Sequence, residues 1–335
     1  MKKLWLVLMI TVVAVGCGAP KQDSGTSGGT APETAAKAAD DELVIAVVPK
    51  GLAHQFWLTV KAGAEAAGAE FGAEILWQGP AKETEVDKQI NIIEDMIGRN
   101  VDAIVMAACD ENALVDVIQE AIDAGIPVVT IDSGVQSDIP VSFVATDNIE
   151  GAKAAARELA RLVGEEGNVG LVPFVKGAAT SEMREQGFKE GIQEFPNIEL
   201  VSVLYSESDA AKGMAVTEDM MTSHPDLKGV FAASEPTAVG VAQAVSAAGK
   251  AGQVKVVGFD ASDQEIEDLK KGIIQALVVQ NPYRMGYEGV KAAIDHLAGK
   301  EVPKRVDTGV VVVTIDNFES PEIQKILYPL KDPNG

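Results

Sequence analysis

The densest group of chemically useful side chains lies in the segment PKGLAHQFW, residues 49–57. It brings Lys50, His54, Phe56 and Trp57 together directly after an apolar run that has the composition of a buried strand. Aromatic faces stack on flat or hydroxyl-bearing ligands, while lysine and histidine donate hydrogen bonds to hydroxyl groups. The alternative for the two aromatic residues is that they begin a helix and pack into the core. This loop is therefore a candidate ligand-binding loop.

Two aspartates end two copies of one sequence pattern. AIVMAACDENALVDVIQEAIDAGIPVVTID closes on Asp132, and GVFAASEPTAVGVAQAVSAAGKAGQVKVVGFD closes on Asp260. Each copy reads as strand, acid-bearing loop, small-residue helix and β-branched strand. Ligands bind outside the carboxyl ends of strands in open parallel sheets, so each aspartate is expected to face a cleft between two similar lobes. Helix capping or an ion pair at the lobe interface is the alternative for both.

Three further polar residues stand at element boundaries. Gln280 follows a strand just before Pro282, where its amide could reach a ligand from the hinge side. Arg184 begins a helix of the second half, either as a ligand donor or as one partner of a local ion pair. Asp147 has the position of a helix cap before residues 149–163.

The sequence offers little for catalysis or metal binding. Its three histidines, His54, His224 and His296, are far apart and lack metal-ligand spacing. There is no G-x-S-x-G elbow, no P-loop, and no G-x-G-x-x-G after the first strand. A formal charge of −22, from 28 basic and 50 acidic residues, argues against nucleic acid as a partner. We predict no enzyme activity, no cofactor and no metal.

Alternating strands and helices must position these residues. From residue 43 onward, apolar strand-like runs alternate with helical segments of 10 to 17 residues, which indicates βαβ units and parallel sheets. About ten strands exceed one comfortable sheet. The predicted fold class is therefore α/β, with two doubly wound parallel-sheet lobes. VDTGVVVVT, residues 306–314, is predicted as one further strand.

The N-terminus has the features of an export signal. MKK is followed by a short apolar run and then by AVGC, which places Gly16 before Cys17. Small residues before a cysteine resemble the bacterial lipobox, so we predict that residues 1–16 are a signal peptide and that Cys17 is lipidated. The alternative is an ordinary signal peptide with an incidental cysteine. Residues 17–41, rich in Gly, Ala, Ser and Thr, read as a flexible tether. The protein would be anchored to the cell membrane by lipid alone, facing the periplasm or the cell exterior. With Cys17 lipidated, Cys109 is the one remaining cysteine, so no intramolecular disulfide can form. Cys109 is predicted to be a small buried hydrophobic residue.

In order along the chain, AHQFW, IPVVTID, ATDN, REQGF, VFAAS, VVGFD and VVQNPYRMGY resemble the type I periplasmic sugar-binding proteins of ABC transporters. The resemblance is to the ribose-, galactose-, glucose- and xylose-binding cluster and runs from about residue 43 to 315. It implies a multi-strand hinge with crossings near 146–148, 280–282 and 306–308. The N-terminal lobe would comprise residues 42–146 and 282–305, and the C-terminal lobe 147–281 and 306–335.

The resemblance also implies a ligand set drawn from both lobes. It assigns contact positions to Lys50, His54, Phe56, Trp57, Asp132, Thr146, Arg184, Ser234, Asp260 and Gln280, with Ser208 nearby. Ribose-type members have arginine after the first-lobe aspartate, whereas this chain has Ser133. The set is therefore not the ribose set, and G-x-x-H-x-x-W is closer to the glucose- and xylose-like branch.

The function implied is capture of a monosaccharide-like ligand by hinge closure and its delivery to an ABC permease. Two alternatives stay open at this point. The same clamp could bind a polyol, a furanone-type signal or an amine, or it could feed a sensory receptor rather than an importer.

Overall fold

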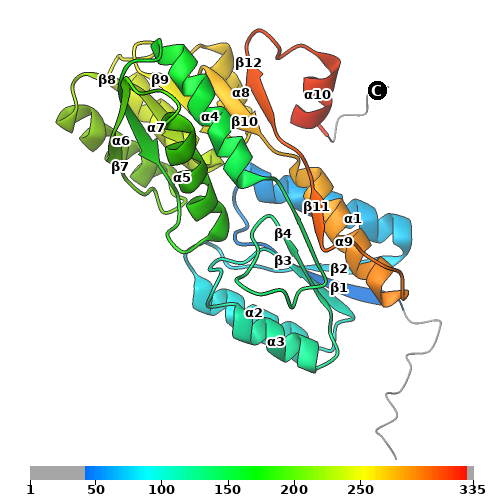
Figure 1. The fold of residues 1–335 in the computed structure, drawn as a ribbon. Helices are drawn as coiled ribbons and strands as arrows, with labels where there is room; N and C mark the ends of the chain where they lie inside the picture. The colour runs from blue at the N-terminus through cyan, green and yellow to red at the C-terminus, as the bar shows by residue number, and fades with distance from the viewer. Residues whose placement is uncertain (1–41, 330–335) are drawn as a thin grey trace, which may run out of the picture. The chain divides into compact units, whose positions relative to one another are not determined.

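A computed structural model describes residues 42–329, which form two α/β lobes (Figure 1). The predicted signal peptide, Cys17 and the predicted tether lie outside the described residues. The first lobe holds the strands β1 (Leu43–Val48), β2 (Ala73–Trp77), β3 (Ala103–Met106), β4 (Val128–Ile131), β5 (Ser142–Ala145) and β11 (Arg305–Asp307). Its helices are α1 (Gln55–Phe71), α2 (Val86–Gly98), α3 (Val115–Asp123) and α9 (Pro282–Leu297).

The second lobe repeats this arrangement. Its strands are β6 (Gly167–Val172), β7 (Ile198–Val203), β8 (Leu227–Ala232), β9 (Lys255–Phe259), β10 (Ala276–Val279) and β12 (Val311–Thr314). Its helices are α4 (Asn148–Val163), α5 (Ala179–Ile192), α6 (Ala210–Ser223), α7 (Glu235–Ala247), α8 (Asp263–Lys270) and α10 (Pro321–Leu327). The sequence did not predict α10, a single short helix that opens on Pro321.

Both sheets have the same strand order. The first runs β2-β1-β3-β4-β5-β11, and the second runs β7-β6-β8-β9-β10-β12. Every pairing is parallel except that of β12 with β10, which is antiparallel. This 2-1-3-4-5 order is that of doubly wound sheets, where ligands bind beyond the strand ends at the switch point. The predicted fold class is confirmed.

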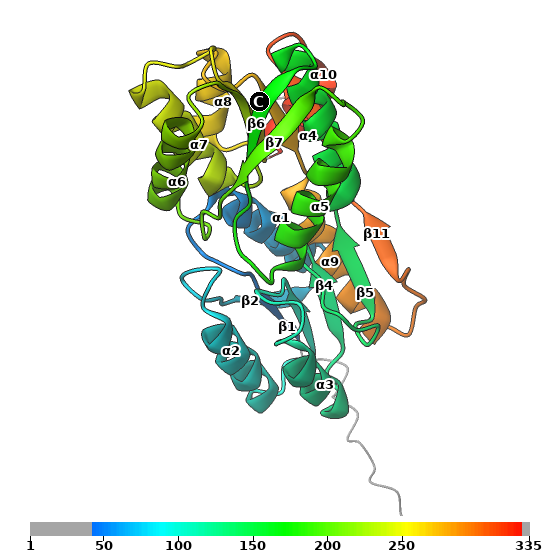
Figure 2. The same cartoon turned by 60° about the vertical axis from the view of Figure 1, so that its left-hand side comes forward.

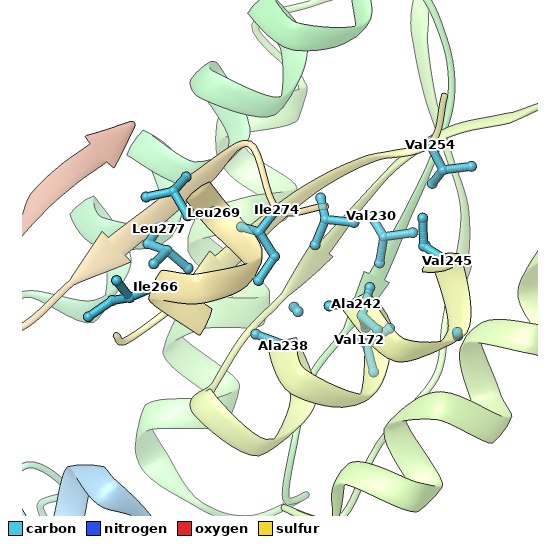
Figure 3. Packing of buried hydrophobic residues seen from close by; sticks show 14 of the residues in the cluster. Val172, Val230, Ala238, Ala242, Val245, Val254, Ile266, Leu269, Ile274 and Leu277 are labelled. Carbon is cyan, nitrogen blue, oxygen red and sulfur yellow. The ribbon is translucent and has the colours of Figure 1, made fainter. Parts of the chain in front are cut away.

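Helices cover both faces of each sheet, as the two views show (Figures 1 and 2). In the first lobe, α1 and α9 cover one face and α2 and α3 the other, over two separate apolar clusters. In the second lobe, α4 and α5 cover one face and α6, α7 and α8 the opposite face. Figure 3 shows the core beneath α7 and α8 of the second lobe, where Val230 of β8 and Leu277 of β10 belong to one cluster with Ala238 and Ala242 of α7. Two buried cores per lobe hold the strand ends in fixed positions.

Helix α1 carries part of the candidate ligand loop and is fixed by close packing on α9. A Cβ atom added to Gly63 would lie 2.0 Å from Tyr283 O, and one added to Gly286 would lie 2.0 Å from Val60 O. Only glycine permits the two backbones to approach this closely. The middle of α1 is thus packed directly against α9, the helix that follows a hinge crossing.

The predicted single strand at 306–314 is wrong. The segment is divided into β11, which pairs with β5 of the first lobe, and β12, which pairs with β10 of the second. Gly309 interrupts it with a positive φ of 80°, and its N–H donates to Asp307 Oδ1 at 2.9 Å. An aspartate whose side chain accepts from the backbone N–H two residues later is typical of a turn, and the sequence Asp-Thr-Gly at 307–309 has this pattern. The chain crosses between the lobes at this turn, as it also does between β5 and α4 and between β10 and α9.

Candidate functional site

Side chains from both lobes converge on one cavity, whose space of about 300 Å³ between the atoms includes its opening to solvent. The residues that line it are Lys50, His54, Phe56, Trp57, Glu83, Asp132, Phe174, Arg184, Ser208, Ser234, Glu235, Pro236, Asp260 and Gln280. Nine of the ten predicted contact residues are among them, and Ser208 is present as well. We call this cavity the cleft cavity.

The strand ends explain why these residues meet. Lys50 follows β1, Asp132 follows β4, Asp260 follows β9 and Gln280 follows β10. The two aspartates occupy equivalent places in the two sheets, and both have positive φ angles, 53° for Asp132 and 85° for Asp260. This conformation costs energy for a residue other than glycine, and residues that adopt it are found most often at functional sites. The repeated sequence pattern therefore does aim two carboxylates at one cavity.

Lys50 and Asp132 form a buried ion pair in the first lobe. Lys50 Nζ lies 2.9 Å from Asp132 Oδ2, and both side chains are 3% exposed. Lys50 also donates to Ser133 Oγ at 3.2 Å and to Thr180 Oγ1 of the second lobe at 3.0 Å. Burial acts to lower the pKa of Lys50, but Asp132 and Glu83 more than offset it, and the net shift is upward. The lysine is therefore a fixed cation that orients Asp132.

Glu83 is a cavity residue that the sequence reasoning missed. Its Oε1 accepts from the Trp57 indole Nε1 at 2.8 Å, and its Oε2 accepts from Ser208 Oγ of the second lobe at 2.6 Å. His54 Nδ1 is 3.7 Å from the same carboxylate. Burial acts to raise the pKa of Glu83, but Lys50 and His54 outweigh it and hold that pKa far below its usual value. Glu83 lies in the loop just before α2, which begins at Val86, and an acid in that place reads as an ordinary residue of a helix start.

In the second lobe, Asp260 accepts two hydrogen bonds and faces one more distant cation. Gln280 Nε2 donates to Oδ1 at 2.6 Å, Glu235 N donates to Oδ2 at 3.1 Å, and Arg184 Nη1 lies 3.9 Å from Oδ2. Burial nevertheless raises the pKa of Asp260 above its usual value. The oxygen of the same amide, Gln280 Oε1, is buried and has no hydrogen-bond partner within residues 42–329. Buried acceptors are normally satisfied, so this atom is oriented toward a donor that the protein does not supply.

Arg184 is mainly a scaffold for the cavity wall. Its Nε donates to Asn148 Oδ1 and its Nη1 to Ala233 O, both at 2.8 Å. Its guanidinium carbon lies 3.7 Å from the centroid of the Phe259 ring. Arg184 also lines the cavity and faces Asp260 as a distant ion partner.

Trp57 belongs to the core and to the cavity at once. It is 1% exposed and packs in the apolar cluster beneath α1, yet it lines the cleft cavity. Phe56 meets it edge to face, with ring centroids 4.9 Å apart. Phe174, which follows β6 and was not predicted, adds an aromatic ring from the second lobe. The cavity therefore presents aromatic surface from both sides.

Three residues named in the sequence analysis have structural positions, and for Thr146 this differs from the predicted ligand contact. Thr146 does not line the cleft cavity, because its hydroxyl bonds Thr308 Oγ1 at 3.3 Å and Gly309 O at 3.2 Å, at the hinge. Asp147 caps α4 by accepting from Glu150 N at 3.0 Å, as predicted. Cys109 is buried, and burial raises the pKa of its thiol strongly, which agrees with an unreactive side chain.

Within residues 42–329 there is no group of three or more histidine, cysteine, aspartate or glutamate side chains arranged to hold a metal ion. No helix in the same range is long and apolar enough to cross a membrane.

A buried carboxyl next to the site makes a pH prediction possible. Glu265 of α8 is 0% exposed; its Oε2 accepts from Ser262 N and Oγ, and its Oε1 has no hydrogen-bond partner in the part of the chain that the structure describes. Burial, with the nearby carboxylates of Glu235 and Asp260, holds the pKa of Glu265 well above the usual 4.5. The folded protein therefore binds this proton more tightly than the unfolded chain does. As the pH rises above about 4.5, the stabilisation is lost, with a slope of at most about 1.4 kcal/mol per pH unit.

We expect Glu265→Gln, which keeps the shape without the proton, to remove this slope and to gain stability relative to wild type as the pH rises. Urea unfolding of both proteins between pH 4 and 8 measures the difference. Parallel stability curves would show that Glu265 does not change its protonation on folding.

Comparison with known proteins identifies the family. A model described as a periplasmic binding protein domain matches residues 45–301. The chain belongs to the periplasmic binding protein family. The D-ribose/D-allose-binding protein of Pseudomonas aeruginosa is 36% identical over 285 residues, covering 83% of this chain and 89% of that protein. The D-allose-binding periplasmic protein of Escherichia coli is 32% identical, covering 84% of this chain and 93% of that protein.

Solved structures of periplasmic binding proteins agree with the fold. An ABC transporter solute-binding protein from Agrobacterium vitis with bound D-fucose has a TM-score of 0.83 and 39% identity, covering 85% of this chain and 100% of that chain. A carbohydrate transporter solute-binding protein from Agrobacterium radiobacter in complex with D-arabinose has a TM-score of 0.84 and 35% identity. The match covers 86% of this chain and 100% of that chain. The prediction of a type I sugar-binding protein of ABC transporters, and not an enzyme, is confirmed. Membership of this periplasmic family also implies an exported protein.

Proposed function

We propose that the cleft cavity binds a neutral monosaccharide, which the protein delivers to its ABC permease. The observation that carries this proposal is the convergence of carboxylates, an amide and aromatic rings from both lobes on one small cavity. Carboxylates accept hydrogen bonds from sugar hydroxyls, and the unpartnered Gln280 Oε1 is an acceptor of the same kind. Phe56, Trp57 and Phe174 supply apolar surface for a sugar ring. The relative named for D-allose, and the similar structures with bound D-fucose and D-arabinose, support this class of ligand.

Charge in the cavity favours a neutral ligand over an acidic one. Four carboxylates line it, Glu83, Asp132, Glu235 and Asp260, against the permanent cations Lys50 and Arg184. Lys50 is already paired with Asp132, and Arg184 donates to a side-chain oxygen and a carbonyl. A ligand carboxylate would be desolvated beside uncompensated negative charge, which is strongly unfavourable.

Closure of the lobes would supply the transport signal. In the observed conformation, the first lobe bonds the second through Glu83 with Ser208 at 2.6 Å and Lys50 with Thr180 at 3.0 Å. The backbone N–H of Glu111 also donates to Gly177 O at 3.1 Å. A ligand that contacts both lobes stabilises this conformation by its differential affinity, and the hinge crossings allow the movement.

A matched ligand panel tests the proposal. D-Allose, D-ribose, D-arabinose and D-fucose are compared by thermal shift with D-galacturonic acid, which has the configuration of D-fucose but carries a carboxylate at C6, and with putrescine as an amine. We expect at least one neutral sugar to stabilise the protein by about 2.7 kcal/mol at a hundredfold excess over its dissociation constant. D-Galacturonic acid is expected to give no shift. Stabilisation by putrescine and by no sugar would overturn the proposal in favour of an amine ligand.

We also propose that the exported protein is held at the membrane by a lipid on Cys17. The supporting feature is the short apolar run that ends in AVGC. Mass spectrometry of the mature N-terminus tests this, with a diacylglyceryl adduct on Cys17 as the expected result. An unmodified N-terminus at another residue would contradict it.

A further inference from the structure

Helix α1 receives its N-terminal cap from the opposite lobe. His54, the N-cap residue, makes no side-chain hydrogen bond to the helix, and the first turn contains no acidic residue. The missing acceptors come from Glu235 at the start of α7. Its Oε1 accepts from Gln55 N at 3.0 Å and its Oε2 from Phe56 N at 2.8 Å. Gln55 and Glu235 are 180 positions apart in sequence.

This contact has a clear electrostatic basis. The first backbone N–H groups of a helix have no partner inside the helix, and the helix dipole favours an anion near them. Glu235 supplies both the acceptors and the charge. Its own backbone N–H donates to Asp260 Oδ2 at 3.1 Å, which fixes the start of α7 against the second-lobe aspartate. The cap therefore links Asp260 to the ligand loop of the first lobe.

We propose that Glu235 is a positioning residue that caps α1 only when the lobes are together, and so fixes Phe56 and Trp57 as the cleft closes. The inference rests on the proposed function, because it assumes that the cleft cavity is the ligand site. Both carboxylate oxygens already accept a backbone N–H, so Glu235 acts through α1 rather than as the main acceptor for a ligand. Residue 56 donates to the cap directly and residue 57 follows it, so the cap sets where the aromatic rings lie.

A second contact across the same cleft supports this role. Gln55 Oε1 accepts from Asp263 N of the second lobe at 2.9 Å. The first turn of α1 is thus bonded to the N-terminal ends of both α7 and α8, whereas its own lobe provides no side-chain cap. Opening the cleft breaks these bonds and leaves the amides of Gln55 and Phe56 to solvent.

Amide hydrogen exchange tests the cap without any ligand. In Glu235→Ala, exchange at Gln55 and Phe56 is expected to accelerate by about tenfold over wild type, the usual loss for a helix cap. Glu235→Gln retains one acceptor and should give an intermediate rate. Asp209→Ala is the matched control, because Asp209 caps α6 within its own lobe by accepting from Lys212 N at 2.9 Å. It should accelerate exchange at Lys212 and leave Gln55 and Phe56 unchanged. Unchanged exchange at those two amides in Glu235→Ala would overturn the proposal.

Ligand dissociation separates positioning from simple stabilisation. The probe is whichever of D-allose, D-ribose, D-arabinose and D-fucose binds wild type most tightly. Glu235→Ala is expected to raise its dissociation rate by about tenfold with little change in the association rate, while Asp209→Ala leaves the dissociation rate as in wild type. An equal dissociation rate in Glu235→Ala and wild type would also overturn the proposal. If no sugar binds wild type, the proposed function fails, while the exchange experiment still decides whether the cap exists.

Discussion

Lys50→Met is expected to lower the free energy of unfolding by about 3–5 kcal/mol, because it removes one partner of a buried ion pair. Methionine keeps most of the volume of lysine but leaves the Asp132 carboxylate without its cation, 2.9 Å away in the native protein. Glu83 also loses the nearest permanent positive charge that holds its pKa down. Urea unfolding at neutral pH measures the change. Sugar binding should be lost as well, since the Asp132 carboxylate would lose the cation that orients it.

The double variant Lys50→Met with Asp132→Asn is the control. It removes both charges together, and buried pairs replaced on both sides are close to neutral in stability. Asparagine also tolerates the positive φ of 53° at position 132. We expect the double variant to recover most of the stability lost by Lys50→Met, but not the ligand affinity. A double variant as unstable as the single one would show that the lysine stem, rather than its charge, is what the site requires.

Sequence reasoning located the cleft because the residues it used lie at strand ends. Lys50, Asp132, Asp260 and Gln280 each follow a buried apolar run, and the end of a parallel strand has a fixed place in a doubly wound sheet. The two aspartates could be paired from the repeated pattern alone. That inference needs only the order of strands and helices, which local periodicity determines well.

The residues that were missed depend on contacts between distant segments. Glu83 lies beyond the end of β2, in a loop that reads as a helix start, and its role comes from Trp57, His54 and Ser208. Glu235 reads as the ordinary first-turn acid of its own helix, although its carboxylate bonds the amides of another helix. For Thr146 the sequence predicted a ligand contact, but its hydroxyl instead bonds Thr308 at the hinge crossing between β11 and β12. No local pattern records which partner a side chain meets across a cleft.

The two lobes are alike in topology and different in electrostatics. In the first lobe a lysine neutralises the aspartate directly, and a second buried carboxylate, Glu83, holds the tryptophan. In the second lobe Asp260 is bonded mainly by the neutral groups of Gln280 and the Glu235 backbone, and burial keeps its pKa high. The two lobes therefore hold their aspartates by different means, the first with a cation and the second with neutral donors.

Trp57→Ala is expected to weaken sugar binding by more than tenfold, equivalent to over about 1.4 kcal/mol, and to lower stability by about 3–5 kcal/mol. Both effects follow from its double position, 1% exposed in the first-lobe core and at the wall of the cleft cavity. The substitution also removes the indole donor of Glu83 at 2.8 Å, which leaves a buried carboxylate oxygen short of a partner. Calorimetric titration with the best-binding sugar of the panel and urea unfolding measure the two effects separately.

Trp57→Phe distinguishes the ring from its N–H. Phenylalanine retains an aromatic face in the cavity but cannot donate to Glu83, so stability should fall by about 1–3 kcal/mol while most of the ligand stacking survives. If the ring face contacts the sugar, Trp57→Phe should bind much more tightly than Trp57→Ala. If both variants bind as tightly as wild type, Trp57 serves only the core, and the aromatic surface of the site must come from Phe56 and Phe174. If both bind equally weakly, the bond to Glu83 rather than the ring face controls affinity, because that bond joins the ligand loop to the carboxylate that Ser208 of the second lobe also contacts.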